Sequence, residues 1–195
     1  FHYRMKEKIR CIWPNNDLLM IKYHDTEWGV PIKNDRKIFE FLVLESAQAG
    51  LSWRTILYKR KGYKKAFANF NPKKVSKFTK KDINKLLKNS EIIRNKLKIE
   101  SAINNAKRFL EVQKEFGSFN KYIWGFVKGK QIDGKRKTLK DLPAITKEAE
   151  EFSKDLKKRG FKFLGPTVIY AHMQATGMVN DHTTDCFRYK FKTSK

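Results

Sequence analysis

Between two predicted helices the sequence reads Gly160-Phe161-Lys162-Phe163-Leu164-Gly165. Thr146 is a suitable N-cap for the helix that Gly160 ends, and Pro166 opens a second helix that Gly177 ends. Two helices joined by a tight loop with glycine at both ends predict a helix-hairpin-helix over about residues 147–176. The backbone of the loop and the N–H groups at the start of the second helix are suited to bind an anion such as a DNA phosphate. An ordinary corner between two helices has the same spacing, so the pattern alone leaves both open.

Helical signals continue over most of the chain. Helices are predicted from about Asp35, as N-cap, to Ala49, from Asn95 to Glu115 with Gly117 as its stop, and over 119–126 after Ser118. Short helices are expected to open at Asn71-Pro72 and at the capping pair of Thr79 and Asp82. The Gly- and Lys-rich segment 128–142 predicts a surface loop that can form a short hairpin around Asp133-Gly134. We therefore expect an all-α fold in a single domain over residues 1–195.

Charge and composition narrow the class of protein. The 195 residues carry a net charge of +24, which favours a polyanionic partner such as nucleic acid, although Lys-rich composition also arises without that role. No apolar run approaches the roughly 18 residues that span a bilayer, and the basic segment Phe1–Arg10 lacks the apolar core of an export signal. Two cysteines are too few for a disulfide scaffold. We expect a cytoplasmic protein without membrane contact.

Glu45 continues the apolar stripe of the predicted helix, which contains Ile38, Phe41 and Leu42. A carboxylate at a core-facing position is costly to bury without a partner, and such a residue is more often functional than an exposed glutamate. A glutamate near the end of a helix also reaches water easily. The pattern leaves both roles open.

Two further polar residues are predicted to have structural roles. Glu40 lies one turn from Arg36 and Lys37, which predicts a solvated ion pair. His172 lies inside an apolar helix and is predicted to be a core residue.

The stretch Gln48-Ala49-Gly50-Leu51-Ser52-Trp53 begins three residues after Glu45. Gly50 ends the helix and leaves Leu51 on a turn. An exposed leucine on a rigid turn can fill the gap that a flipped base leaves in a duplex. Packing in the core is the commoner role of leucine and is the alternative here.

The aromatic residues in the first third of the chain include Trp13, Tyr23, Trp28 and Trp53. Aromatic faces stack on bases, and they attract a cationic base more strongly than a neutral one. Simple core packing is the alternative.

Two cysteines and two histidines have a spacing that suits a metal. Cys11 lies thirteen residues before His24, and His182 lies four residues before Cys186, where the two can share a helical face. Two sulfur and two nitrogen ligands form a tetrahedral set without an open position, which suits a structural zinc. Such a zinc would clasp the terminal segments 11–24 and 182–186, and free buried thiols are the alternative.

Several of these segments together resemble the DNA-3-methyladenine glycosylase I family of the helix-hairpin-helix glycosylase superfamily. The matching stretches are Tyr23-His24-Asp25-Thr26-Glu27-Trp28-Gly29, the run from Leu44 to Trp53, the Gly160–Gly165 loop and Val179-Asn180-Asp181-His182. The match runs from about Arg10 to Cys186. The resemblance implies a monomeric, monofunctional repair enzyme that flips 3-methyladenine out of alkylated double-stranded DNA and hydrolyses its bond to the sugar.

The resemblance also implies roles for individual residues. It implies a structural zinc on Cys11, His24, His182 and Cys186. It places Glu45 in recognition of the base and, secondarily, in catalysis, with Tyr23, Trp53, Trp13 and Trp28 around the base. It assigns DNA contacts to Leu51, Gly50, Gln48, Gly160, Lys162, Gly165 and Thr167.

Two positions bear on the chemistry that the resemblance implies. Thr167 stands where strand-cleaving relatives carry a lysine, which argues against a lyase step. Asp181 is the nearest candidate for the catalytic aspartate of the superfamily, a role that we do not assign to it. A non-catalytic, zinc-containing helix-hairpin-helix protein that binds DNA or RNA is the alternative function.

Overall fold

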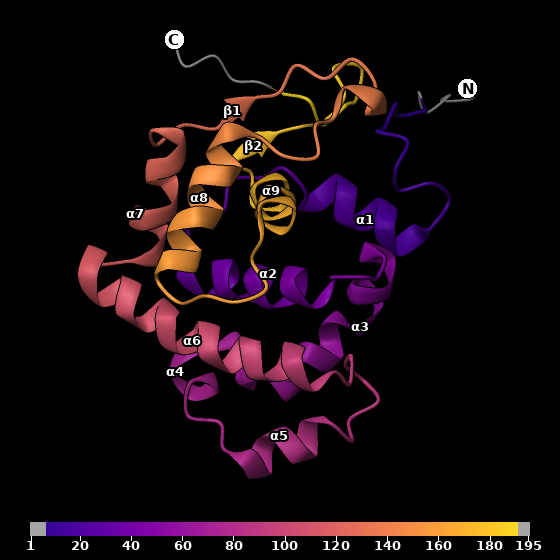
Figure 1. Ribbon diagram of the computed structural model, residues 1–195. Coiled ribbons are helices and arrows are strands. Elements are labelled where there is room, and N and C mark those ends of the chain that lie inside the picture. The colour runs from indigo at the N-terminus through magenta and orange to yellow at the C-terminus, as the bar shows by residue number, and fades with distance from the viewer. Residues whose placement is uncertain (1–6, 191–195) are drawn as a thin grey trace.

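Helices make up most of residues 7–190, the part of the chain that the computed structural model describes (Figure 1). The first six and last five residues of the predicted domain lie outside it. The helices are α1 (Leu18–Thr26), α2 (Asp35–Ala47), α3 (Trp53–Ala66), α4 (Pro72–Val75), α5 (Lys80–Leu86), α6 (Lys96–Phe116), α7 (Phe119–Trp124), α8 (Lys147–Lys158) and α9 (Pro166–Ala175), with 3₁₀ turns η1 (Ala68–Phe70), η2 (Gly125–Val127) and η3 (Leu139–Asp141). Within the described range, no helix combines the length and apolar composition that crossing a membrane requires.

Most of the predicted helix ends are confirmed, because capping side chains lie where the sequence places them. The Asn95 side chain accepts a hydrogen bond from the Lys98 N–H at 3.1 Å, at the start of α6. The backbone N–H and the hydroxyl of Thr79 donate to Asp82 at 2.7 and 3.0 Å, at the start of α5. Gly117 ends α6 with a φ of 87°, a left-handed conformation that favours glycine. Helices α1 and α3 were not among the predicted ones.

Asp35 does not cap its own helix, contrary to the prediction. Asn34 is the N-cap of α2, since its side chain accepts a hydrogen bond from the Lys37 N–H at 3.0 Å. The Asp35 carboxylate instead accepts hydrogen bonds from the N–H groups of Phe119 and Asn120, at 2.8 and 2.9 Å. These groups begin α7, so the negative charge of Asp35 stabilises the N-terminus of a distant helix.

Helix α2 is the centre of the fold. It packs against α9, α6 and α3, and it lies between α9 and α6 in Figure 1. Every residue from Ile38 to Ala47 is buried, so this helix has no solvent-facing side over that stretch. Glu45 is therefore held inside the protein together with the apolar residues of α2.

Glu40 is buried rather than solvated, which corrects the predicted surface pair. It is 6% exposed and lies on the side of α2 that faces α3. Arg60 of α3 donates to its two carboxylate oxygens at 3.1 and 3.3 Å, and Lys37 lies 3.2 Å away. Arg60 also donates to Glu27 at 2.8 Å. The partner is twenty residues away in the sequence, so helical spacing does not reveal it.

Helices α8 and α9 form the predicted helix pair, and α6 holds the loop between them. The Asn105 amide donates to the Lys162 carbonyl and accepts from the Lys162 N–H, both at 2.8 Å. Gly160 ends α8 with a φ of 88°, and its carbonyl accepts a hydrogen bond from Asn104 at 2.8 Å. The side chains of α6 therefore anchor the backbone of the loop by hydrogen bonds.

The predicted hairpin around Asp133-Gly134 is wrong. Strand β1 (Ile132–Asp133) pairs in parallel with β2 (Val179–Asn180), far away in the sequence. A Cβ atom at Gly134 would collide with Asp181, so glycine here allows two chain segments to approach closely instead of forming a turn. The two strands are two residues each, and the fold remains mostly helical.

His172 is a core residue, as predicted, and it makes the fold sensitive to acid. Its side chain is fully buried, neither ring nitrogen has a hydrogen-bond partner among the described residues, and burial lowers its pKa to about 3. The unfolded chain takes up the proton near pH 6.5, so the folded state loses stability below that pH, by about 1.4 kcal/mol per pH unit down to about pH 3.

We expect His172→Leu, which has a similar volume and no titrating group, to remove this loss. Urea unfolding at pH 7.5 and pH 5 measures it: the native protein should lose about 2 kcal/mol more than the variant between the two values. As the control, His172→Leu must be folded at pH 7.5, so that the two proteins are compared from the same starting state. An identical pH dependence in both proteins would show that His172 is not the titrating group.

Candidate active site

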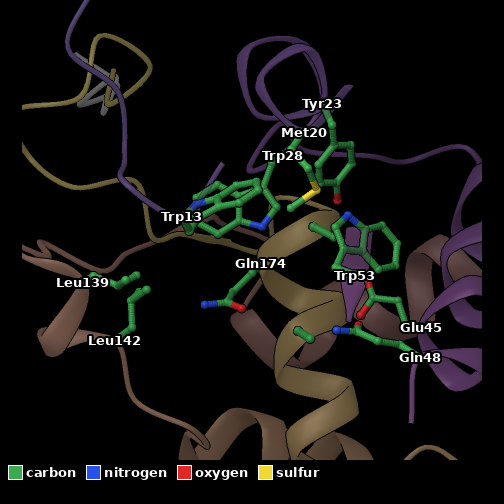
Figure 2. Close-up of a pocket in the computed structure, with 12 residues that line it drawn as sticks. Trp13, Met20, Tyr23, Trp28, Glu45, Gln48, Trp53, Leu139, Leu142 and Gln174 are labelled. Carbon is green, nitrogen blue, oxygen red and sulfur yellow. The ribbon is translucent and has the colours of Figure 1, made fainter. Parts of the chain in front are cut away.

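A cavity of about 240 Å³ lies between α1, α2, α3 and α9 (Figure 2). It brings together all five residues predicted to recognise a base, and the predicted DNA contact Gln48. Its lining consists of Trp13, Met20, Tyr23, Trp28, Glu45, Gln48, Trp53, Leu139, Leu142, Ala171, Gln174 and Ala175. Residues from both ends of the chain and from its middle thus form one site.

The walls of the cavity are aromatic. The rings of Trp13 and Trp28 have their centres 5.1 Å apart at 63°, and those of Tyr23 and Trp53 lie 5.5 Å apart at 46°. Phe41 supports Trp53 from behind in a stacked arrangement at 6.5 Å. The indole N–H groups of Trp13 and Trp53 have no hydrogen-bond partner among the described residues. The cavity therefore offers flat apolar faces and free donors to a planar, polar ring such as a purine.

Glu45 supplies the carboxyl group of the cavity. It is 3% exposed, and its Oε2 atom has no hydrogen-bond partner among the described residues. The alternative of a glutamate that reaches water is therefore wrong. Burial raises its pKa well above the ordinary value. A buried carboxylate without a partner at the wall of a cavity favours a ligand that donates hydrogen bonds or carries positive charge.

Tyr23 lies beside Glu45 as a neutral hydrogen-bond donor. Burial and, next, the negative charge of Glu45 raise the pKa of the Tyr23 hydroxyl well above its ordinary value. Figure 2 shows that Tyr23, Trp53 and Glu45 gather at one end of the cavity. This end is the polar one, and it combines a donor with an acceptor.

Gln174 is a cavity residue that the sequence analysis missed. Its amide donates to Asp181 at 3.0 Å, and Arg136 donates to the other carboxylate oxygen at 3.0 Å. The Tyr170 hydroxyl is a third donor to Asp181, which is 1% exposed. Asp181 therefore orients Gln174, and both of its carboxylate oxygens already accept hydrogen bonds from other side chains. No signal in the sequence marks Gln174, because none of the predicted base-binding residues lies on α9.

Leu139 and Leu142 also escaped the sequence analysis, because their segment was predicted to be a surface loop. Leu139 is the first residue of turn η3 and Leu142 follows its last, and the turn begins at a capping box of Thr138 and Asp141. Figure 2 shows both leucines at the end of the cavity opposite Glu45. No local periodicity marks them, since only the tertiary fold brings the segment to α9.

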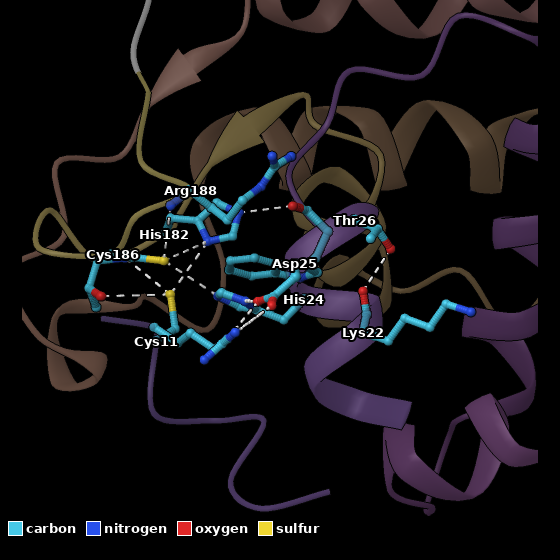
Figure 3. A network of polar contacts seen from close by, with 11 residues as sticks. Cys11, Lys22, His24, Asp25, Thr26, His182, Cys186 and Arg188 are labelled. Atoms are coloured by element: carbon cyan, nitrogen blue, oxygen red, sulfur yellow. Dashed lines mark hydrogen bonds and ion pairs between the residues drawn. The ribbon is translucent and has the colours of Figure 1, made fainter. Parts of the chain in front are cut away.

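A second cluster lies next to the cavity and contains the four predicted metal ligands (Figure 3). Cys11, His24, His182 and Cys186 are all buried, and their ligand atoms lie within 4.8 Å of one another. The Cys11 Sγ to His182 Nδ1 distance is 3.5 Å, as is the Cys186 Sγ to His24 Nε2 distance. Tetrahedral zinc bonds of 2.3 Å to sulfur and 2.0–2.1 Å to nitrogen separate these atoms by about 3.5 Å. The donor set therefore fits a zinc ion.

The outer hydrogen bonds orient both histidines. His24 Nδ1 lies 2.8 Å from Asp25, which Arg10 holds at 2.8 Å, and His182 Nε2 lies 2.9 Å from the Trp28 carbonyl. The remaining nitrogens, Nε2 of His24 and Nδ1 of His182, face the two sulfurs. Metal-binding histidines in proteins are typically held in this way.

The residues from His182 to Cys186 form a turn and not a helix, so the predicted shared helical face is wrong. The Cys186 N–H donates to the Thr183 carbonyl at 2.9 Å, and the Thr183 N–H donates to Cys11 Sγ at 3.4 Å. The turn brings the two ligands together through these backbone hydrogen bonds.

The cluster of predicted metal ligands packs directly against the cavity wall. The Trp13 and His24 rings have their centres 5.4 Å apart, and those of Trp28 and His182 lie 4.7 Å apart. The two indoles of the cavity are thus packed against two of the predicted ligands. An intact cluster keeps both indoles in place.

Leu51 lies on the turn between α2 and α3. It is 39% exposed, which contradicts the alternative of a core leucine. Gly50 has a φ of 77°, and the Leu51 N–H donates to the Gln48 carbonyl at 2.6 Å. The turn is therefore ordered, and it presents an apolar side chain at the surface close to the cavity.

The hairpin loop offers fewer free donors than expected. The Lys162 N–H is bound to Asn105, so Lys162 itself can offer an anion only its exposed side chain. Gly165 is the N-cap of α9 without a side-chain cap, which leaves the first N–H groups of α9, including that of Thr167, available. Gly160 serves to end α8. DNA contacts of Gly160, Lys162, Gly165 and Thr167 stay predictions.

Comparison with known proteins gives consistent matches over nearly the whole chain. The sequence profile described as methyladenine glycosylase matches residues 13–189. The DNA-3-methyladenine glycosylase of Haemophilus influenzae is 45% identical over 177 residues, 91% of this chain and 96% of the relative.

Solved structures agree with this. A crystal structure of 3-methyladenine DNA glycosylase I has a TM-score of 0.91 at 43% identity, covering 93% of this chain and all of the other. A structure of a variant of 3-methyladenine DNA glycosylase I in complex with 3-methyladenine has a TM-score of 0.89 at 37% identity, covering 91% and 95% of the two chains.

Proposed function

Because this chain belongs to the methyladenine glycosylase family, we propose that it excises 3-methyladenine from alkylated double-stranded DNA and leaves an abasic site. The observation that carries the proposal is the position of Glu45. Its unpartnered carboxylate oxygen lies at the wall of an aromatic cavity, where a cationic purine meets both charge and stacking. A relative whose structure contains 3-methyladenine supports this choice of base.

The base must leave the helix before it can enter the cavity. Extrusion costs a few kcal/mol, and Leu51, exposed on its ordered turn, is suited to fill the gap and offset part of that cost. Lys162 and the free N–H groups at the start of α9 would hold the phosphates of the lesion strand. These contacts ignore base sequence, as a damage-scanning enzyme requires.

Recognition would take place at the polar end of the cavity. The Tyr23 hydroxyl and the Glu45 carboxylate offer a hydrogen-bond donor and an acceptor to the edge of the purine. Trp53 would stack on the face of the purine, and Trp13 would line the cavity beside it. A cationic base also lowers the free energy of the ionised Glu45 inside the cavity. An unmethylated adenine lacks this charge, which provides the discrimination.

The chemical step needs little acid catalysis, because a base that carries a positive charge is already a good leaving group. It departs as neutral 3-methyladenine, the sugar carbon gains the hydroxyl of a water molecule, and the remaining proton passes to solvent. Glu45 binds the base and stabilises the positive charge as it moves to the sugar. A free amine at position 167 would be needed for a lyase step, and Thr167 provides none.

The metal has a structural role in this proposal. Cys11, His24, His182 and Cys186 would hold one zinc ion, and four protein ligands leave no open coordination position. The ion would link the first and last described segments behind Trp13 and Trp28.

Product analysis tests the proposed function. The protein is incubated with duplex DNA methylated by an alkylating agent, and the supernatant is analysed for free purines. We expect 3-methyladenine, together with strands that stay intact until alkali is added. Binding without release of base would instead support the non-catalytic DNA- or RNA-binding alternative. Strand breaks before alkali would contradict the monofunctional mechanism.

A further inference from the structure

Lys98 of α6 holds the turn that follows α2. Its Nζ atom donates to the Ala47 carbonyl at 2.8 Å and to the Ala49 carbonyl at 2.6 Å. These carbonyls lie between Glu45 and Leu51 in the chain. One ammonium group thus fixes the segment that connects the acidic residue of the cavity with the exposed leucine.

The charge of this group matters at the same place. The C-terminus of α2 carries the partial negative charge of its unpaired carbonyls, and the turn must approach the phosphates if Leu51 enters a duplex. The Lys98 ammonium satisfies these carbonyls and offsets their charge. Without it, the turn would both gain freedom and repel the backbone of the DNA.

The same face of α6 also anchors the hairpin loop. Asn105 lies seven residues, or about two turns, after Lys98, and it holds the backbone of Lys162 by two hydrogen bonds of 2.8 Å. Seven residues of helix span about 10 Å, so the two anchoring side chains lie about two turns apart on one rigid helix. Helix α6 therefore sets the spacing between the turn of Leu51 and the hairpin loop, which is proposed to hold the phosphates.

We propose that Lys98 is a positioning residue for base extrusion, which fixes the turn of Leu51 at the distance from the hairpin loop that a flipped nucleotide requires. The inference rests on the proposed function, since it needs a lesion that leaves the helix. Lys98 does not touch the base: it acts through Leu51.

The test replaces Lys98 with Met, which keeps the length of the side chain and removes its charge and donors. We expect single-turnover excision of 3-methyladenine to slow by about five- to tenfold, as for the loss of charge-assisted hydrogen bonds. A second measurement uses 2-aminopurine placed beside an abasic analogue in the duplex, because the fluorescence of 2-aminopurine rises when its stacking is broken. The rise that the protein causes should be smaller for Lys98→Met, to an extent similar to the loss of rate. Lys96→Met is the matched control: it removes the same charge from an exposed position on α6 and should leave both signals nearly unchanged.

A double-mutant cycle with Leu51→Ala separates positioning from direct phosphate binding. If Lys98 acts through the turn, Lys98→Met should cost little in the Leu51→Ala background. Equal losses in both backgrounds, or no loss in either, would overturn the proposal. Lys98→Arg keeps the positive charge and several hydrogen-bond donors, so it must recover most of the excision rate. This expectation holds even if Lys98→Met lowers the melting temperature.

Failure of this inference can be told apart from failure of the proposed function. If the unaltered protein releases no 3-methyladenine, the proposed function is wrong. If it releases the base at a rate that Lys98→Met does not change, the function stands and the positioning role is wrong.

Discussion

Replacing Glu45 with Gln is expected to slow excision of 3-methyladenine by roughly a hundredfold or more, because the cavity loses the charge that pairs with the cationic base. Gln keeps the shape of the side chain, so stacking on Trp53 and binding of undamaged duplex should change little. Single-turnover rates on alkylated DNA and titration with undamaged DNA measure the two effects. Excision near the normal rate would remove Glu45 from the recognition of the base.

The same substitution should stabilise the free protein. The pKa of Glu45 is raised by burial, so the folded chain binds its proton more tightly than the unfolded chain, where the ordinary value of 4.5 holds. The carboxyl group therefore costs stability as pH rises above about 4.5, by about 1.4 kcal/mol per pH unit up to the folded pKa. Gln does not titrate and avoids this cost.

Unfolding experiments at pH 5 and pH 7 measure this gain. The stability advantage of Glu45→Gln should grow between these values, while Glu111→Gln, at an exposed site on α6, should show no such growth. A variant that loses both activity and stability would indicate a disrupted fold and would contradict the assignment of an unpartnered buried carboxylate.

Replacing Cys186 with Ser is expected to lower the melting temperature by about 10 °C or more and to abolish zinc binding. Ser cannot supply the thiolate, and the ligands that remain lie buried around an incomplete site. The loss should also weaken substrate binding, because Trp13 and Trp28 pack against His24 and His182.

Metal analysis of the purified protein gives the first measurement, with about one zinc per chain expected for the native form and almost none for Cys186→Ser. Thr184→Ser, an exposed change in the same turn, is the control and should keep both zinc and stability. A native protein without zinc, or a variant as stable as the native one, would show that the cluster consists of free thiols and histidines.

Local chemistry made part of the fold predictable. Capping residues such as Thr79, Asn95 and Thr146 mark helix starts because each satisfies N–H groups within three residues. Glycines at 117 and 160 mark helix ends for the same local reason. Glu45 and Trp53 meet in one cavity because α2 packs against α3, and α1, which also packs against α3, adds Tyr23.

Features that depend on distant partners were missed or predicted wrongly. Asp35 follows the pattern of a local cap, yet it binds α7 across the fold. Glu40 has suitable neighbours on its own helix, yet Arg60 of an unpredicted helix pairs with it. Asp133 pairs with Asn180 in parallel, and Leu139 reaches the cavity only through the tertiary fold. In each case the deciding partner lies at least twenty residues away, where periodicity carries no information.

The clasp between the two ends of the described chain also determines when the cavity can be completed during synthesis. Cys11 and His182 are separated by 171 residues, which a ribosome adds in roughly 10 to 30 s. Until His182 and Cys186 emerge from the ribosome, Trp28 lacks the side chain of His182 against which it packs. The aromatic wall of the cavity is therefore incomplete in the nascent chain. Contacts of such long range also form slowly. The aromatic wall of the cavity can therefore be completed only after the segment that contains His182 and Cys186 has been synthesised.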